Sequence, residues 1–378
     1  FWLKLPLGGK RWATGLYNKA PLQRERKAGI AMTSSSSEKR KPPTKIAGGR
    51  FDIDKKLGAG CFGEVWRGHD TTSKEQVAVK FEDIQSHASQ LEHEADVLRY
   101  LAKPTRPQGF AAVFYFGNET HYRCLVMECL GRSLEERMQG EKGKFTVATT
   151  VLIADQVLRR IEYLHSRGIV HRDIKPENFM FGVKEKIHHL YIIDFGLSKR
   201  YHEQKHVQMR AKLSLTGTAR YASINAHKGM EQSRRDDLEA IGHMLAYFLR
   251  GALPWSGLDA RTQEEKYRKI REKKEEVRLD DLLADFPDAF KIYLKSAREL
   301  DFKERPNYNA YRKLFKEVRD KIKSDGPLED HQYQWFECKE FGPIVPLVLD
   351  DNIRQPDDAV PQAKRGFCLC GSKSKVND

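Results

Sequence analysis

Hydrophobic and polar residues alternate along the chain from Phe51 onward. Phe51, Ile53 and Leu57 are separated mainly by charged residues, and this alternation is typical of a half-buried β-strand. The pattern predicts a second strand that ends at Trp66 and a third strand over residues 76–80. We therefore expect an antiparallel sheet near the start of the ordered chain.

Longer segments carry apolar residues at helical spacing. One apolar helix face is formed by Leu91, Ala95, Leu98 and Leu101. A helix is expected over residues 149–166, with Gly168 as its C-cap. Residues 233–250 predict a helix that is buried on most sides, with Asp237 near its start holding other backbone in place. Further amphipathic, highly charged helices are expected at residues 264–276, 288–300 and 308–323.

Two short apolar runs predict buried strands at residues 123–130 and 190–193. The chain has 378 residues, which is more than one core usually organises. We therefore expect an α+β fold of two lobes, flanked by tails. The charged run over residues 264–276 alternates in sign and is expected to form a solvated helix face, not a nucleic-acid patch.

Composition narrows the class of protein. Hydrophobic residues make up 39% of the chain and aromatic residues 10%, as in globular proteins. The six cysteines are scattered and form no metal-ligand spacing, which favours a reducing, intracellular setting. The sequence contains no apolar run of the roughly 18–20 residues that a membrane helix needs.

The net charge of +14 is concentrated in an N-terminal arm. Residues 1–50 hold 12 Lys and Arg against two Glu, so the arm is either a solvated tail or a contact for nucleic acid or anionic lipid. Residues 32–49 are rich in Ser, Lys, Pro and Gly and are expected to be a linker. Met32 resembles a translation start, and residues 1–31 are then either a translated leader or the edge of a fragment.

A glycine-rich segment lies between the first two strands, at residues 58–65. Glycine lets backbone approach a phosphate closely, but the pattern alone also marks dinucleotide sites. Strands on both sides of it favour a hairpin that closes over a nucleotide. Lys80 ends an apolar strand, where a lysine is costly unless it is paired, and Glu94 on the next helix can reach it.

Residues 171–178 read His-Arg-Asp-Ile-Lys-Pro-Glu-Asn, and Asp194-Phe195-Gly196 begins sixteen residues after Asn178. Asp173 can accept a proton from an attacking hydroxyl, and Lys175 can hold a phosphate. Asn178 and Asp194 offer the hard oxygen ligands that Mg²⁺ prefers. Phosphoryl transfer needs these parts, because its catalysis consists mainly of positioning and charge neutralisation. The motif set resembles that of protein kinases.

Downstream signatures resemble the casein kinase I family of protein serine/threonine kinases. Ser223-Ile224-Asn225 stands where many kinases have Ala-Pro-Glu, and residues 216–225, 231–239 and 253–255 look like signatures of this family. The resemblance implies a two-lobed kinase fold with a small antiparallel N-lobe, one main helix in that lobe and a larger, mainly helical C-lobe. It divides the chain into an arm (1–46), a kinase domain (47–336; N-lobe about 47–127, hinge 128–131, C-lobe about 132–336) and a flexible tail (337–378).

The resemblance also implies ATP and Mg²⁺ as cofactors and gives roles to individual residues. Asp173 would be the base, assisted by Lys175, with Asn178 and Asp194 as the magnesium ligands. Backbone groups of Glu128 and Leu130 would bind adenine, and Met127 would gate the pocket. The full set expected at ATP is Leu57, Gly58, Gly60, Gly63, Val65, Ala78, Lys80, Glu94, Met127, Glu128 and Leu130.

Members of the family favour acidic or already phosphorylated substrates, and their anion-binding positions fall on Arg220, Gly257 and Lys266. A guanidinium, a backbone N–H and an ammonium can together hold a phosphate, although Arg220 could instead merely order its loop. The chain departs from the family where a usual lysine falls on Leu213. A basic cluster before Lys266 is also absent, and Arg261 and Lys269 are its expected substitutes.

The tail suggests lipidation. Cys368 and Cys370 lie beside basic and apolar residues, as in the palmitoylated tails of membrane-bound members of the family, and two acyl chains suffice for stable anchoring. We expect a cytoplasmic monomer that associates with membranes through this tail, with a nuclear pool left open and no nucleic-acid partner. The alternative function is a catalytically weak, kinase-shaped scaffold.

Overall fold

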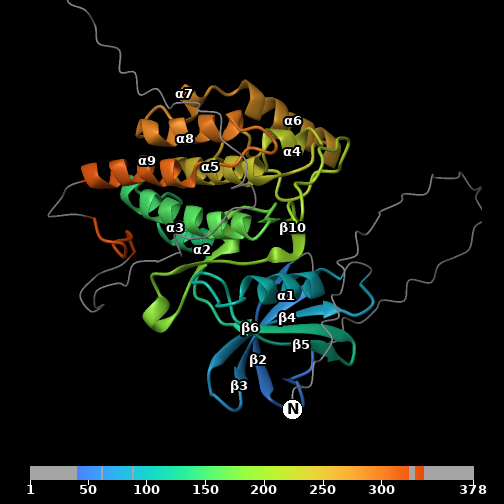
Figure 1. The fold of residues 1–378 in the computed structure, drawn as a ribbon. Helices are drawn as coiled ribbons and strands as arrows, with labels where there is room; N and C mark the ends of the chain where they lie inside the picture. Colours follow the sequence, from blue (N-terminus) through green and yellow to red (C-terminus); the bar gives the residue numbers. More distant parts are fainter. Residues whose placement is uncertain (1–40, 61–62, 87–88, 323–327, 336–378) are drawn as a thin grey trace, which may run out of the picture. The chain divides into compact units, whose positions relative to one another are not determined.

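The computed structural model describes residues 41–60, 63–86, 89–322 and 328–335. All of the elements below lie in the compact unit that begins at Pro42. Within this unit the sheet strands gather at one end and most helices at the other (Figure 1). The expected α+β arrangement of two lobes is confirmed.

The N-lobe is a six-stranded antiparallel sheet with the strand order β1-β2-β3-β4-β6-β5. Its strands are β1 (Lys45–Ile46), β2 (Phe51–Gly60), β3 (Gly63–Asp70), β4 (Gln76–Asp83), β5 (Val113–Glu119) and β6 (Tyr122–Glu128). Helix α1 (Gln90–Leu101) follows β4 and contacts β5 and β6. The predicted strands and the predicted helix are present, but β3 and β4 extend beyond the predicted ends because their pairing continues.

The predicted linker over residues 32–49 is wrong at its end. Lys45 and Ile46 form β1, in which they pair with Asp52 and Phe51 of β2. Ile46 is buried in an apolar cluster of the N-lobe. A strand of two residues is too short to show alternation, so its stability comes from the neighbouring strand. The domain therefore includes residues before the predicted start at 47.

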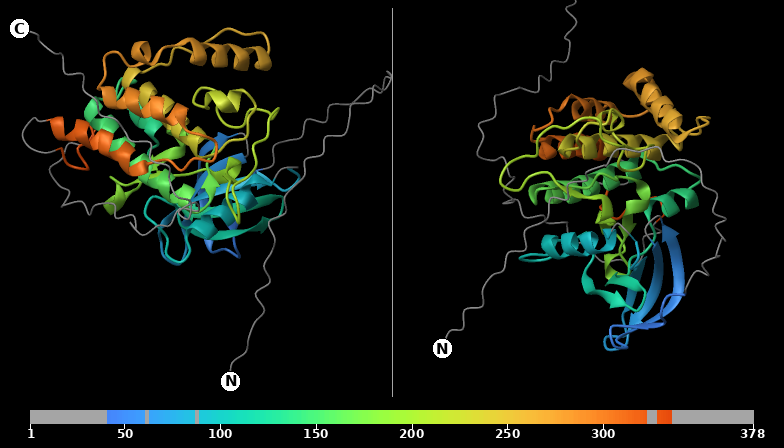
Figure 2. Two further views of the ribbon diagram at one scale, coloured as in Figure 1. Left: turned by 45° about the horizontal axis from the view of Figure 1, so that its top comes forward. Right: turned by 90° about the vertical axis from the view of Figure 1, so that its right-hand side faces the viewer.

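The C-lobe is mainly helical and is built around α3 (Figures 1 and 2). Its helices are α2 (Leu134–Gly140), α3 (Val147–Ser166), α4 (Ile224–His227), α5 (Arg234–Arg250), α6 (Gln263–Glu276), α7 (Leu279–Leu282), α8 (Asp288–Glu299) and α9 (Tyr308–Lys321). Two small antiparallel ladders pair β7 (Ile169–Val170) with β10 (Lys199–Arg200) and β8 (Phe179–Phe181) with β9 (Leu190–Ile192). In sequence order they lie between α3 and α4. Short 3₁₀ turns are η1 (Pro176–Asn178), η2 (Lys184–Lys186) and η3 (Phe195–Leu197).

Helix ends follow local chemistry. Gly168 follows α3 with φ +75°, the left-handed conformation that the predicted cap requires. A Cβ there would come within 2.3 Å of the carbonyl oxygen of His202, so a side chain does not fit. Helix α5 ends in the same way at Gly251, whose φ is +81°. The predicted ends of these two helices are confirmed.

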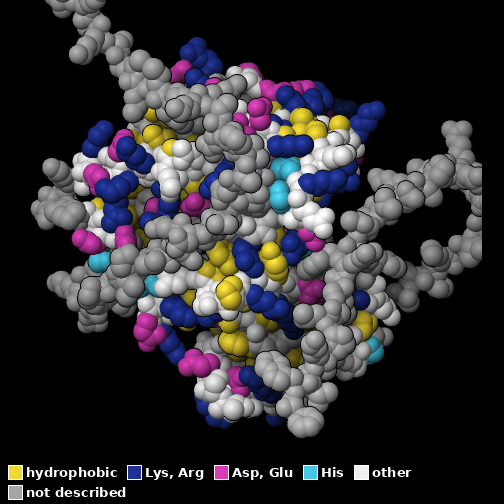
Figure 3. Space-filling view, in the orientation of Figure 1, with side chains coloured by type: hydrophobic (Ala, Val, Ile, Leu, Met, Phe, Trp, Pro, Cys, Tyr) yellow, Lys and Arg dark blue, Asp and Glu magenta, His cyan; other side chains and the backbone are white. Residues whose placement is uncertain are grey.

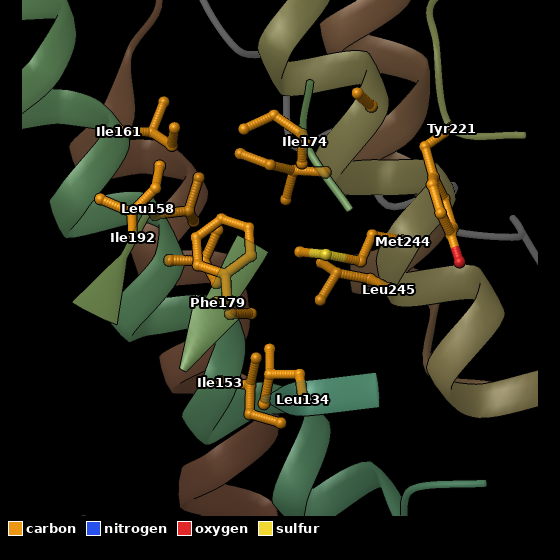
Figure 4. Packing of buried hydrophobic residues seen from close by; sticks show 14 of the residues in the cluster. Leu134, Ile153, Leu158, Ile161, Ile174, Phe179, Ile192, Tyr221, Met244 and Leu245 are labelled. Atoms are coloured by element: carbon orange, nitrogen blue, oxygen red, sulfur yellow. The ribbon is translucent and has the colours of Figure 1, made fainter. Parts of the chain in front are cut away.

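Buried side chains of α3, α5 and the two ladders form the main core (Figure 4). Ile174, within the motif of residues 171–178, and Phe179, directly after it, point into this core and are almost completely buried. Burial of side chains of this size stabilises a fold by roughly 1.5–3 kcal/mol each. The motif is therefore anchored by apolar residues on both sides of its polar ones.

None of the helices in the described part of the chain is both long enough and apolar enough to cross a membrane. On the face seen in Figure 3, Lys and Arg side chains are scattered among Asp and Glu.

Candidate active site

The loop after β7 is fixed by Asp237 of α5. The Asp237 carboxylate accepts hydrogen bonds from the backbone N–H groups of His171 (2.7 Å) and Arg172 (2.9 Å). His165 lies 2.9 Å from the same carboxylate, and Asp237, His165 and His171 are buried. Burial opposes ionisation of Asp237, but the hydrogen bonds and charge interactions with His165 and His171 together outweigh it, so the pKa of Asp237 is lowered. The predicted anchoring role of Asp237 is confirmed.

Asp173 follows this anchored backbone, and its carboxylate is held in place by four donors, of which Asn178 Nδ2 at 3.3 Å is the most distant. One carboxylate oxygen accepts from Lys175 Nζ at 2.6 Å. The other accepts from the backbone N–H of Thr218 at 2.8 Å and from its hydroxyl at 2.7 Å. Burial would raise the pKa of Asp173, but the Lys175 charge and these hydrogen bonds lower it. The carboxylate is therefore ionised near neutral pH and can accept a proton.

Asn178 and Asp194 lie beside Asp173. Asn178 Nδ2 donates to the carbonyl oxygen of Asp173 at 2.9 Å, which leaves its side-chain oxygen free of partners in the described part of the chain. Asp194 has a left-handed backbone (φ 64°), and its Oδ1 lies 4.0 Å from Lys80 Nζ. An amide oxygen and a carboxylate are the ligand types that Mg²⁺ takes alongside water and phosphate. These two residues fit a magnesium ion that is shared with a bound nucleotide.

Lys80 and Glu94 form the expected pair between β4 and α1. Lys80 Nζ lies 2.7 and 2.8 Å from the two carboxylate oxygens of Glu94. Burial disfavours the ammonium, but Glu94 and Asp194 outweigh this cost and raise the pKa of Lys80. The charge of Lys80 is therefore kept at the inner end of the site, where it can bind phosphate.

The glycine-rich segment is a hairpin, as predicted, since β2 pairs directly with β3 at Gly58–Val65 and Gly60–Gly63. Gly63 has φ +142°, and a Cβ there would come within 1.9 Å of the carbonyl oxygen of Phe81. This position therefore requires glycine. The two residues at the tip of the hairpin, 61 and 62, lie outside the described part.

A cavity of about 520 Å³ lies under this hairpin, and ligand pockets usually have volumes of 300–1,000 Å³. Its lining includes predicted residues from the hairpin, the ion pair and the catalytic loop: Gly58, Gly63, Val65, Lys80, Glu94, Lys175, Asn178 and Asp194. The structure thus brings together groups that are as much as 136 residues apart in sequence, between Gly58 and Asp194. Asp173 is not part of this lining but is bonded to Lys175 and Asn178, which are. The predicted residues Leu57, Ala78, Met127, Glu128 and Leu130 do not line this cavity either.

Those remaining residues lie around the hinge. Met127 is buried and pairs with Ala78 across β6 and β4, while Leu57 is 52% exposed. The backbone N–H of Glu128 already donates to the carbonyl oxygen of Ala112 at 2.9 Å. The N–H of Leu130 has no partner among the described residues and is therefore open to a ligand.

The side chain of Glu128 has a role that the sequence did not indicate. Its carboxylate accepts from Arg106 at 2.7 Å, from Lys186 at 2.9 Å and from the Tyr191 hydroxyl at 3.2 Å. Burial would raise the pKa of Glu128, but Lys186 and Arg106 lower it. Because these partners lie on both sides of the hinge, the network ties the N-lobe to the C-lobe. Spacing in the sequence carries no signal for such distant partners.

The segment between Asp194 and Ser223 is held by Glu231, which is 1% exposed. Its carboxylate accepts from Lys199 Nζ at 2.7 Å and from Arg210 Nε at 2.7 Å. Ser223 then caps α4 by accepting from the Ala226 N–H at 2.9 Å. The carboxylate of Glu231 therefore neutralises the cations of Lys199 and Arg210 within this segment.

The structure links two of the segments that carry the predicted anion site, those of Arg220 and Gly257. The carbonyl oxygen of Arg220 accepts from Trp255 Nε1 at 2.7 Å, and Gly257 follows two residues later with φ +71°. Lys266 on α6 is exposed and makes no ion pair within the described ranges. The Arg220 guanidinium lies 5.7 Å from the ring centre of Tyr247. Convergence of the three groups on one phosphate remains a prediction.

Two expectations for this region need correction. Lys269 is not available as a substitute cation, because its ammonium pairs with Glu265 at 2.9 Å and donates to the Asp259 carbonyl oxygen at 2.7 Å. The charged run of α6 is not wholly solvated either, because Lys274 is completely buried. Leu213, in place of the usual lysine, is 37% exposed.

Cys368 and Cys370 lie outside the described residues, as do residues 1–40 of the arm, so their roles stay predictions. A family model described as protein kinase domain matches residues 51–315 of the chain, which is more than half of its length. The match covers the glycine-rich hairpin, the Lys80–Glu94 pair, the catalytic loop, the residues expected at the anion site and most of the helical lobe.

Proposed function

Because the chain belongs to the protein kinase family, we propose that it is a serine/threonine kinase of the casein kinase I type. It would transfer the γ-phosphate of ATP, with Mg²⁺, to acidic or already phosphorylated proteins. The observation that carries the proposal is a cavity lined by Lys175, Asn178, Asp194 and the Lys80–Glu94 pair. The buried, ionised carboxylate of Asp173 adjoins this lining through hydrogen bonds from Lys175 and Asn178.

In the proposed reaction, the hydroxyl oxygen of the substrate forms a bond to the γ-phosphorus as the bond to the ADP oxygen breaks. The hydroxyl proton passes to the carboxylate of Asp173, whose lowered pKa keeps it ready to accept. Lys175 lies 2.6 Å from that carboxylate, and its ammonium can also reach the phosphoryl group in transit. The proton, the phosphoryl group and the leaving ADP are then all accounted for.

Asn178 and Asp194 would hold the magnesium ion, which neutralises phosphate charge when it is bound. Lys80 would contact the α- and β-phosphates from the opposite lobe, oriented by Glu94. The Leu130 N–H faces no competing acceptor among the described residues, which supports its proposed bond to adenine. Each proposed contact uses a group that is either free or fixed by a buried partner.

Arg220, Gly257 and Lys266 would select substrates by binding an anion upstream of the target hydroxyl. Two observations support this choice. Lys266 has no carboxylate partner in the described ranges, and the backbone of Arg220 is fixed to the segment that carries Gly257. A charge-assisted hydrogen bond contributes about 1.5–3 kcal/mol, which is enough to separate phosphorylated from unmodified substrates.

The alternative function is a scaffold with the same fold and weak catalysis. The intact Lys80–Glu94 pair and the ionised Asp173 favour the enzyme, because a scaffold has no need to keep either of them. The deciding experiment measures transfer of labelled phosphate from MgATP to casein and to a phosphoserine-containing peptide. We expect transfer by the wild type and its loss in Asp173→Asn, with the exposed Asp320→Asn as the matched control. Equal transfer by wild type and Asp173→Asn would refute the proposed mechanism.

A further inference from the structure

One buried lysine of α6 serves no purpose in the scheme above. Helix α6 is highly charged, and within it only Ile270 and Lys274 are buried. Lys274 is 0% exposed. Taking a lysine out of water is costly unless its donors are satisfied, so contacts of Lys274 must repay this cost.

Lys274 holds the backbone on both sides of Arg220. Its Nζ donates to the carbonyl oxygen of Ala219 at 2.9 Å and to that of Ala222 at 2.6 Å. The ammonium also lies 5.4 Å from the ring centre of Trp255, a favourable cation–π distance. These contacts join α6 to a segment that lies 52 and 55 residues earlier in the sequence.

The two carbonyl groups between these are held as well. Trp255 Nε1 donates to the carbonyl oxygen of Arg220 at 2.7 Å, and His243 Nδ1 donates to that of Tyr221 at 2.8 Å. Four consecutive carbonyl groups are therefore bonded by side chains of the C-lobe. Such bonding leaves the backbone of this segment little freedom to rotate. The position of the Arg220 Cα, from which the side chain extends, is therefore fixed.

The electrostatic surroundings of Lys274 allow these bonds to persist. Glu239 stabilises the charge of the ammonium and Arg298 opposes it, while burial lowers the pKa of Lys274 to about 7. A neutral amine still has two N–H donors, which is the number that the two carbonyl groups need. Lys274 can therefore hold both in either protonation state.

Lys266 stands on the same helix, eight residues before Lys274 and so about 12 Å away along the helix axis. We propose that Lys274 is a positioning residue for substrate recognition, through which α6 fixes Arg220 relative to Lys266 so that both cations meet one phosphate. This inference rests on the proposed function and deepens it. Lys274 would set the geometry of the anion site and would not itself contact the substrate.

The test compares Lys274→Met with Lys273→Met. Both variants remove one ammonium from α6, but Lys273 is partly exposed, and its ion pair within the described residues is with Glu276. Steady-state kinetics at saturating MgATP would use a peptide with phosphoserine upstream of the target and a matched peptide with alanine there. We expect Lys274→Met to raise KM for the phosphorylated peptide about 10-fold and to change kcat/KM for the other peptide less than about twofold. Lys273→Met should match the wild type on both.

Circular dichroism and thermal melting would reveal whether Lys274→Met folds. A second variant keeps the test decisive if it does not. Trp255→Phe keeps the ring but removes the bond to the Arg220 carbonyl oxygen, and it should shift the preference in the same direction. If Lys274→Met does not fold, Trp255→Phe decides by the same criterion.

Three outcomes would overturn the inference. Retention of the wild-type preference by these variants, or an equal loss on both peptides, would refute the role of Lys274 and leave the proposed function standing. A wild type that does not prefer the phosphorylated peptide would refute the anion site as well, and the two failures are therefore distinguishable.

Discussion

The catalytic loop and the segment that carries Arg220 are built in different ways. In the catalytic loop, neighbouring side chains bond one another: Lys175 reaches Asp173, two residues away, at 2.6 Å. In the Arg220 segment the backbone is held by distant side chains, such as Lys274 at 2.9 Å from a carbonyl oxygen 55 residues earlier. Asp237 and Thr218, 45 to 66 residues away, also hold the catalytic loop, but its reactive side chains bond one another locally. The Arg220 segment has four consecutive carbonyl groups bonded by distant side chains, so the recognition of substrates depends more heavily on tertiary contacts.

The two regions also differ in how many partners within the protein their main side chains already have. In the catalytic loop the carboxylate of Asp173 already has four donors before any substrate is present. Lys266, at the expected recognition site, has no ion-pair partner in the described part of the chain. We infer that the catalytic loop is organised in advance, while the recognition region completes its contacts with the substrate. Changes in the first region should therefore affect all substrates alike, and changes in the second should affect only some.

The largest effect is expected from Asp194→Asn. Loss of this carboxylate removes a proposed magnesium ligand, so transfer should fall about 1,000-fold, equally on phosphorylated and unmodified peptides. The melting temperature should change little, because the carboxylate is partly exposed and lies 4.0 Å from Lys80 Nζ. Initial rates at saturating MgATP would measure the loss. A loss confined to one peptide would contradict the inference that changes in the catalytic region affect all substrates alike.

Glu94→Gln should have the next largest effect. Without its carboxylate partner, Lys80 loses the bonds at 2.7 and 2.8 Å that orient it, and a displaced group near the reaction can cost about 100-fold in rate. We expect KM for ATP to rise and the loss to be the same on both peptides. Glu92→Gln, on the exposed side of the same helix, is the matched control and should behave as the wild type does. Normal activity of Glu94→Gln would remove the ion pair from the mechanism.

Arg220→Ala and Lys266→Ala should act selectively. Each variant removes one charge-assisted contact, so kcat/KM should fall about 10- to 100-fold on the phosphorylated peptide and little on the unmodified one. Lys269→Ala is the control, because that ammonium is already paired with Glu265. Equal losses on both peptides would show that Arg220 and Lys266 support the fold instead of binding an anion.

The smallest effect is expected from a residue that lies in neither region. Burial, followed by the charges of His188 and Arg160, lowers the pKa of His189 from 6.5 to about 4. Below pH 6.5 the unfolded chain takes up a proton that the folded chain resists, so this histidine makes the fold less stable as the pH falls from 6.5 to 4. Relative to His189→Gln, the wild type should lose up to about 1.4 kcal/mol of unfolding free energy per pH unit.

Urea unfolding between pH 7.5 and 5 would measure this difference. His121→Gln, at an exposed position of the N-lobe, provides the control and should follow the wild type. Parallel pH profiles for wild type and His189→Gln would contradict the expectation. The peptide preference should stay unchanged in both variants, which would separate stability from recognition.

The sequence predicts the catalytic region better than the recognition region for a physical reason. Asp173, Lys175 and Asn178 lie within one loop whose backbone sets their spacing, so the motif nearly determines the geometry. Helices such as α3 and α5 were also predictable, because their apolar spacing and terminal glycines are local signals. What a residue does within its own segment can thus be read from the sequence.

Other features depend on partners that the sequence does not name. β1 is only two residues long and exists because it pairs with β2. The Glu128 network and the burial of Lys274 depend on side chains that lie dozens of residues away. Lys274 in particular stands in a run of alternating charges, which predicts a solvated face. Its burial follows only from the packing of α6 against the Arg220 segment.

Glu231 occupies, as a permanent part of the chain, the position in which a regulatory phosphate would neutralise Lys199 and Arg210. A kinase built in this way would have no upstream activator to wait for at this segment. If its substrates must already carry a phosphate, the timing of each event would be set by whichever enzyme acted on the substrate first. Regulation would then depend on whether the substrate had been phosphorylated earlier, and the kinase itself would be constitutively active.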